Sequence, residues 1–185
     1  MRSPQGIIPC LLSVTLECSK GEWCCIPLKA GFGSCDLTPE IGCPLSGFGG
    51  REELSSSIDD PLFGYALVLR NEETSVAIVC ADLEDVAADF VAGVRDRVTA
   101  ATGMTGEQVM ICATHTHWAP CMNPIPYVKT LLRNSVDEEY AGVAAAALAG
   151  AVIEAYEQLQ PAVVGWGSAR AEGISFNRRP VNLRT

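Results

Sequence analysis

Histidine is scarce in this sequence, and basic residues are fewer than acidic ones. Only two histidines occur among 185 residues, and 13 lysines and arginines stand against 22 aspartates and glutamates, so the formal net charge is −9. A chain with this acidic excess repels phosphate backbones unless a local basic stripe offsets it. The arginines are scattered along the chain, so we expect no nucleic acid partner.

Long hydrophobic runs are also absent. The apolar run at 141–153 is too short to span a bilayer, which takes about 20 residues, so we expect no transmembrane segment. The apolar run at 6–16 resembles a signal peptide only weakly, because Pro9 interrupts it and no small-residue cleavage site follows. We expect residues 1–28 to be irregular. The location stays open, with the cytoplasm slightly favoured over secretion.

The nine cysteines follow no disulfide or zinc pattern. Their number is odd, their spacing is irregular and no C-x-x-C pair occurs. A metal held by Cys18, Cys24 and Cys25 is an alternative that their spacing supports poorly. We therefore expect most of the cysteines to be buried thiols.

Strand and helix patterns alternate along residues 29–185, which predicts an α/β fold. The run at 76–81 is continuously apolar, so we expect both of its faces to be covered. The prediction is a layered mixed β-sheet with helices on both faces. The expected strands are 27–37, 63–70, 75–81, 109–114 and 162–167, with the second and third in an antiparallel hairpin; the expected helices are one that Asp82 caps and Gly103 ends, and one at 137–158.

The two histidines lie two residues apart where an apolar strand ends. In an extended chain residues i and i+2 face the same side, so His115 and His117 present two imidazoles to one point. Two neutral imidazoles suit zinc, and open α/β sheets bind ligands beyond the carboxyl ends of their strands. The alternative is that both histidines only form local hydrogen bonds in a threonine-rich loop.

Several short segments carry a resemblance to one enzyme family. They are Gly31–Pro39, Pro44–Phe48, Asp60–Leu69, Ala77–Asp82, Thr114–Pro120 with its T-H-T-H-x-x-P pattern, and Phe176–Arg178. In this order they resemble the N-terminal part of the catalytic domain of the neutral ceramidases, the neutral/alkaline non-lysosomal ceramidases. The resemblance covers about Lys29–Pro180. It implies a zinc-dependent amidohydrolase that hydrolyses the N-acyl amide of ceramide to sphingosine and fatty acid.

The resemblance also implies roles for individual residues. It makes His115 a zinc ligand, and His117 a catalytic residue that contacts the substrate and carries a proton. Gly47 matches a family glycine whose missing side chain lets the backbone approach the bound amide. Arg178 matches an arginine that donates a hydrogen bond to a substrate hydroxyl or oxyanion. Trp118 stands where the family often has a smaller residue, and adds bulk at the entrance.

The zinc ligand set expected from this chain is incomplete. A catalytic zinc takes about three protein ligands, and the family supplies the others from chain beyond the Phe176–Arg178 segment. Asp82 and Cys121 are candidates to complete the set, but we interpret Asp82 as a helix cap and Cys121 as a packed thiol.

We therefore expect residues 29–185 to be an incomplete N-terminal portion of a larger catalytic domain that binds one Zn²⁺. Its partners would be a lipid-like N-acyl substrate of the ceramide class and the missing C-terminal half of that domain. Two alternatives stay open. The chain is a non-catalytic binding or interaction domain, or it belongs to a relative that hydrolyses another amide or an ester.

Overall fold

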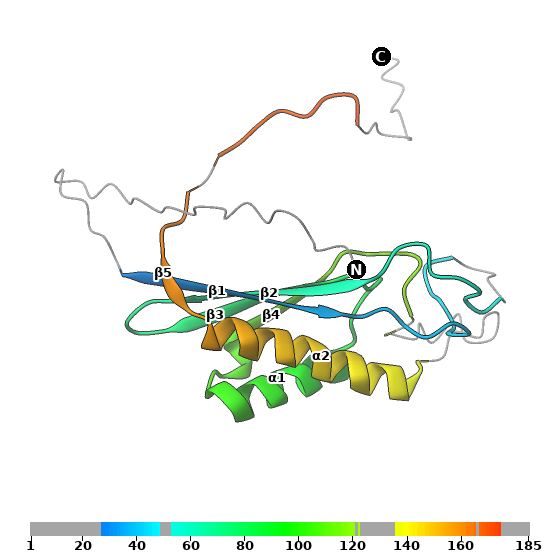
Figure 1. Ribbon diagram of the computed structural model, residues 1–185, viewed down its shortest axis with the longest axis horizontal. Coiled ribbons are helices and arrows are strands. Elements are labelled where there is room, and N and C mark those ends of the chain that lie inside the picture. Colours follow the sequence, from blue (N-terminus) through cyan, green and yellow to red (C-terminus); the bar gives the residue numbers. More distant parts are fainter. Residues whose placement is uncertain (1–26, 49–52, 121, 123–135, 166, 175–185) are drawn as a thin grey trace, which may run out of the picture. The chain divides into compact units, whose positions relative to one another are not determined.

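The computed structural model describes residues 27–48, 53–120, 122, 136–165 and 167–174. The chain divides into two compact units, one of Ile26–Ala162 and one of Met1–Cys25 with Val163–Thr185. The described part of the second unit, 163–165 and 167–174, contains no helix or strand. All elements named below belong to the first unit (Figure 1).

The first unit is built on a five-stranded mixed sheet with the strand order β4-β3-β2-β1-β5. The pair β3 and β4 is parallel, and the other neighbours are antiparallel. The fold is therefore α/β with a mixed sheet, as the sequence predicts. The strands are β1 (Leu28–Asp36), β2 (Phe63–Arg70), β3 (Ser75–Ala81), β4 (Val109–Ala113) and β5 (Gln160–Ala162).

Strands β2 and β3 form the predicted antiparallel hairpin, from Gly64 opposite Ala81 to Arg70 opposite Ser75. Asn71 closes its turn. The Asn71 side-chain oxygen accepts hydrogen bonds from the backbone N–H groups of the two residues before β3, at 3.0 and 2.7 Å. Its own backbone N–H donates to the carbonyl of Thr74 at 3.0 Å. Asparagine favours turns because its side chain supplies such bonds.

Both helices, α1 (Ala88–Thr102) and α2 (Glu138–Glu157), lie on one face of the sheet (Figure 1). In β3 the side chains alternate, so that Val79 and its same-face neighbours are buried while Val76, Ile78 and Cys80 are exposed. The expectation of helices on both faces is therefore wrong for the described residues. Both helices pack together over one side of the sheet.

Among the described residues no helix is both long and apolar enough to cross a membrane.

Helix α2 lies directly against β1 because two buried glycines leave room for its backbone. A Cβ atom on Gly31 would overlap the carbonyl oxygen of Ala155, and one on Gly33 would overlap that of Ala151. The start of α2 is also as predicted, since the Asp137 side chain accepts a hydrogen bond from the backbone N–H of Tyr140 at 3.0 Å.

Helix α1 begins later than the sequence predicts. Its N-cap is Ala87, which makes no side-chain cap bond. Asp82 is not a cap: its carboxylate accepts hydrogen bonds from the Phe63 backbone N–H at 3.0 Å and from the Thr114 hydroxyl at 3.1 Å. The end of the helix is as predicted, because Gly103 adopts φ +75° and its N–H bonds back to the helix.

The last strand also differs from the prediction of 162–167. Strand β5 is Gln160–Ala162 and pairs with Leu28–Ala30 of β1 at the edge of the sheet. Pro161 is tolerated there because an edge strand need not donate a backbone hydrogen bond on its open side.

The cysteines are less buried than the sequence predicts. Among the described ones, Cys43 is buried and Cys35 is half-buried, but Cys80 and Cys112 are exposed on the sheet. Burial raises the pKa of the Cys43 thiol to about 11, and the nearby carboxylate of Asp137 adds to this shift. The cysteines at 10, 18, 24, 25 and 121 lie outside the described residues.

Candidate metal centre

The two histidines lie beyond the carboxyl ends of the parallel strands β3 and β4. The chain segments that follow these strands stay paired: the Thr114 N–H donates to the carbonyl of Ala81 at 2.9 Å, and the Thr116 N–H donates to that of Leu83 at 3.1 Å. The residues just after β3 and those just after β4 therefore lie side by side. This edge of an α/β sheet is where such folds bind ligands.

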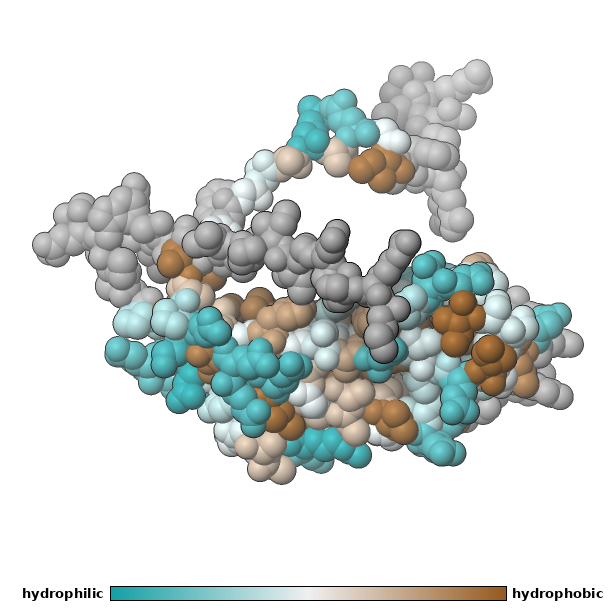
Figure 2. Space-filling view, in the orientation of Figure 1, coloured by the Kyte–Doolittle hydropathy of each residue, from teal (hydrophilic) through white to brown (hydrophobic). Residues whose placement is uncertain are grey.

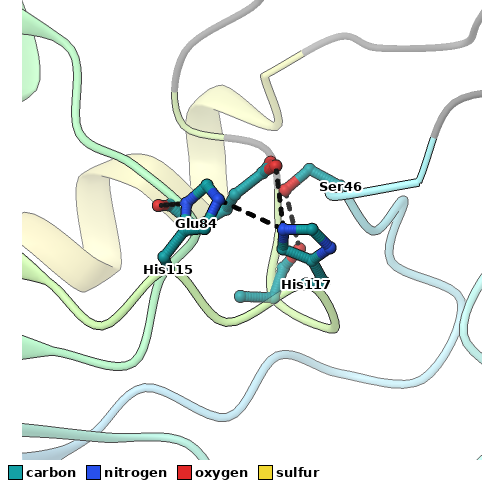
Figure 3. A network of polar contacts seen from close by, with 5 residues as sticks. Ser46, Glu84, His115 and His117 are labelled. Carbon is teal, nitrogen blue, oxygen red and sulfur yellow. Dashed lines mark hydrogen bonds and ion pairs between the residues drawn. The ribbon is translucent and has the colours of Figure 1, made fainter. Parts of the chain in front are cut away.

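The imidazoles of His115 and His117 point to one place, as the sequence predicts. Their Nε2 atoms are 3.2 Å apart (Figure 3). The backbone reason differs from the prediction, because β4 ends at Ala113 and His115 has φ +63°. A residue other than glycine rarely adopts this left-handed conformation, and such strain gathers at functional sites.

A backbone carbonyl orients the His115 ring. The Nδ1 atom of His115 lies 2.9 Å from the carbonyl oxygen of Glu84. A carbonyl only accepts hydrogen bonds, so this ring nitrogen carries the proton and donates it. The Nε2 atom of His115 then keeps its lone pair, directed at His117. Histidines that bind metals are oriented in this way.

Glu84 brings a carboxylate to the same point. Its Oε1 atom lies 4.0 Å from the His117 Nε2 atom, and the ligand atoms of Glu84, His115 and His117 all lie within 4.8 Å of one another. Two imidazoles and a carboxylate are a donor set that catalytic zinc takes. The three residues therefore form a group that can hold a metal ion.

Sequence reasoning missed Glu84 and considered Asp82 instead. Both residues follow β3, and β3 is the neighbour of β4, the strand that precedes the histidines. A carboxylate just after β3 was therefore the signal for either residue, but it can be read only once the two strands are known to be neighbours. The carboxylate of Asp82 is bound to the backbone of Phe63 and to the hydroxyl of Thr114. That hydroxyl lies 2.7 Å from the Thr116 hydroxyl, so Asp82 ties the histidine loop to the sheet.

Gly47 lies against His117. A Cβ atom on Gly47 would come within 2.5 Å of the Cα and Cβ atoms of His117, and Gly47 has φ +99°. The loop is held by its neighbour Ser46, which is buried; its N–H and hydroxyl both bond to the carbonyl of Ala119, at 2.9 and 3.2 Å. The missing side chain of Gly47 thus makes room for His117. Its predicted approach to a substrate amide stays a prediction.

Aromatic side chains border the histidines on one side. The Phe48 ring meets the His117 ring edge-on at 5.1 Å and lies 5.7 Å from the Trp118 ring. Trp118 and Thr116 also line a cavity of about 580 Å³ whose other walls come from the loops before β2. Figure 2 shows apolar side chains, in brown, among polar ones at this loop end of the sheet. The candidate centre is therefore next to a partly apolar cavity.

Two of the residues named from the sequence are not placed. Arg178 and Cys121 lie outside the described residues. The role of Arg178 therefore stays a prediction, and so does the interpretation of Cys121 as a packed thiol.

The described residues have the fold of solved neutral ceramidases. A neutral ceramidase structure from Pseudomonas aeruginosa matches 74% of this chain with a TM-score of 0.64 and 22% identity. A structure of a ceramidase complexed with C2 matches 74% with a TM-score of 0.61 and 20% identity. No protein-family model matches this chain, and no curated protein matches it significantly. The chain spans 22% of the length of either ceramidase chain, and its fold is that of this part of the neutral ceramidases.

Proposed function

We propose that this chain forms the part of a zinc-dependent hydrolase that carries the two histidines, and that the enzyme cleaves the N-acyl amide of ceramide to sphingosine and fatty acid. The observation that carries the proposal is the meeting of two imidazole nitrogens, 3.2 Å apart, at the carboxyl edge of a sheet with a ceramidase fold. The chain spans 22% of the length of either ceramidase chain, so in this proposal other residues of a longer enzyme complete the active site.

In this proposal His115 binds the metal through Nε2, because its Nδ1 proton is engaged with the Glu84 carbonyl. A bound zinc ion supplies Lewis acidity towards the amide carbonyl and lowers the pKa of water. His117 contacts the substrate and passes a proton to the leaving amine. An imidazole suits this step because it accepts and releases protons near neutral pH.

Gly47 and Arg178 bind the substrate in this proposal. The backbone of Gly47 approaches the amide next to His117, where a side chain would collide. Arg178 donates a hydrogen bond to a substrate hydroxyl or to the oxyanion that forms on the carbonyl, since a guanidinium is always charged and donates several bonds.

The cavity beside the histidines supports a lipid substrate. It is bordered by Trp118 and by the apolar side chains of Leu54, Ile58 and Leu62. Polar side chains, among them the carboxylates of Glu53, Asp59 and Asp60, form most of the rest of its lining, so in this proposal an acyl chain or a sphingoid base contacts the apolar part of the cavity.

The test is release of fatty acid from N-acylsphingosine by the protein expressed from the complete reading frame that contains these 185 residues, after loading with zinc. A panel of other amides and esters is assayed in parallel. We expect turnover of the ceramide. A zinc-loaded protein that is inert on every N-acyl lipid contradicts the proposal, and turnover of an ester alone would move the substrate class to esters.

Two variants of the same protein separate metal binding from substrate binding. We expect His115→Ala to abolish both bound zinc and activity. We expect Arg178→Ala to lower turnover while zinc content is retained. Equal zinc content in the wild type and in the His115→Ala variant would overturn the assignment of His115 as a ligand.

A further inference from the structure

The structure brings a third side chain to the histidine pair, and the proposed function does not use it. We propose that Glu84 is a metal ligand, and that Glu84, His115 and His117 together bind one divalent cation in the substrate-free chain. The inference rests on the proposed function only in assuming that the site binds a metal ion. It adds a ligand that the sequence did not predict.

The separation of the two ring nitrogens fits a shared ion. Zinc binds imidazole nitrogen at about 2.05 Å, and two such bonds at the tetrahedral angle place the nitrogens about 3.3–3.4 Å apart. The Nε2 atoms of His115 and His117 are 3.2 Å apart. His117 thus already stands where a second ligand would be.

The Glu84 carboxylate lies beside the two imidazoles, within 4.8 Å of their ligand atoms. Its Oε1 atom is 4.0 Å from His117 Nε2, which exceeds the edge of a zinc tetrahedron by roughly 0.7 Å. A glutamate side chain has three rotatable bonds and can cover that gap, since the side chain of Glu84 is 22% exposed. A carboxylate also brings the negative charge that stabilises a divalent cation beside the two rings.

The backbone holds Glu84 and His115 in a fixed relation. The carbonyl of Glu84 accepts a hydrogen bond from Nδ1 of His115 at 2.9 Å. The carboxylate of the same residue lies near the His117 ring (Figure 3). One residue thus orients a ligand ring through its main chain and offers its own side chain as a ligand. In the substrate-free chain His117 is the third ligand, and its proposed proton transfer belongs to the complex with substrate.

The experiment titrates the metal-free, reduced 185-residue chain with Co²⁺ and measures Zn²⁺ affinity by competition with a chromophoric chelator. The variants are Glu84→Gln, His115→Ala and His117→Ala. The control is Glu107→Gln, an exposed glutamate in the 3₁₀ helix Gly106–Gln108 before β4. Thiolate-bound cobalt adds a charge-transfer band in the near ultraviolet, so visible bands without that band report a nitrogen and oxygen site rather than the cysteines.

We expect one Co²⁺ site with visible bands in the wild type, and an affinity lower by at least about tenfold in Glu84→Gln and in both histidine variants. Glu107→Gln should match the wild type, and circular dichroism should be the same for all. If Glu84→Gln keeps the wild-type affinity while His115→Ala loses the metal, Glu84 is not a ligand. That result overturns the inference and leaves the proposed function unaffected. No histidine-dependent site in the wild type overturns it as well. An intact site in a protein that hydrolyses no ceramide instead counts against the proposed function alone.

Discussion

The position of the His117 ring depends on the absence of a side chain at Gly47. We expect Gly47→Ala to weaken metal affinity by about tenfold or more, because the added methyl group would lie within 2.6 Å of three His117 atoms and must push the imidazole away from His115. The measurement is the chelator competition described above, with circular dichroism to show that the chain stays folded.

Gly42→Ala is the matched control for this variant. Gly42 has a similar backbone, φ +95° against +99° for Gly47, but a Cβ atom there meets nothing within 4 Å. Both variants carry the strain of alanine in the left-handed region, roughly 1–2 kcal/mol, and only Gly47→Ala collides with His117. Equal metal affinities in the two variants would show that Gly47 does not position the ring.

The sequence predicted part of the candidate site, and the missing parts depend on contacts distant in the chain. His115 and His117 stand out because they are the only histidines and share a strand end. Their convergence was predicted from an extended backbone, whereas His115 turns into the left-handed region. Glu84 was missed because its place beside His115 follows from pairing between the segments after β3 and β4, which no local pattern reveals.

At the scale of elements, the contact of α2 with β1 depends on Gly33. We expect Gly33→Ala to lower the free energy of unfolding by about 3 kcal/mol, because its Cβ atom would overlap the carbonyl oxygen of Ala151 and force the helix away from the strand. Gly150→Ala is the control: Gly150 is an exposed position of α2 where a Cβ atom meets nothing within 4 Å.

Alanine in place of an exposed helical glycine should stabilise the fold by about 0.5–1 kcal/mol. Urea unfolding of both variants therefore gives shifts of opposite sign. Two shifts of the same sign would contradict the close packing of α2 on β1.

Tyr140 links the first turn of α2 to the end of β1, and its phenol makes the free energy of unfolding fall as the pH becomes alkaline. Its hydroxyl donates to the carbonyl of Leu37 at 2.6 Å, and burial raises the pKa of its phenol above the ordinary value of 10.0. The folded state then holds this proton more tightly than the unfolded state. Its contribution to stability is complete below pH 10 and is lost as the pH rises further. The raised pKa of Cys43 acts in the same direction from about pH 9.

We expect Tyr140→Phe to cost about 1 kcal/mol near neutral pH, from the lost hydrogen bond, and to show a smaller fall in stability between about pH 8 and about pH 10.5 than the wild type. Urea unfolding at both pH values, under reducing conditions, gives the result. Tyr65→Phe, at an exposed tyrosine of β2, serves as the control. A fall of the same size in Tyr140→Phe and the wild type would contradict the role of the phenol.

The sequence predicted elements well where the signal is local. The β2–β3 hairpin has a turn between two apolar runs, and α2 has an aspartate cap and a long alanine-rich stretch, so both were predicted closely. The start of α1 was wrong because Asp82, a good cap residue, forms long-range hydrogen bonds instead. The prediction of helices on both faces was also wrong for the described residues. Strand β3 is apolar on both faces although only one of them is buried, so its sequence does not show how many faces are covered.

At the scale of the whole molecule, the sheet face opposite the helices carries an apolar row. Phe32 pairs with Leu67, Leu67 with Ile78 and Ile78 with Met110, so the row crosses β1, β2, β3 and β4. Phe32 and Met110 are each 51% exposed and Ile78 is 39% exposed. Contiguous apolar surface of this kind marks an interaction site or promotes association.

We therefore expect the 185-residue chain to self-associate in a concentration-dependent way, and the double variant Ile78→Thr, Met110→Thr to associate less. Threonine is β-branched, as strands favour, so the fold should persist while the row loses apolar area. The control is Val143→Thr, at a helical valine that is 64% exposed on α2, away from this face. Sedimentation velocity over a range of concentrations, with a reductant to keep Cys80 and Cys112 from cross-linking, gives the measurement. If the double variant and the control associate as the wild type does, this face does not drive association. The edges of β4 and β5, which pair with no further strand among the described residues, would then be the next candidates, since edge strands present backbone groups to another chain.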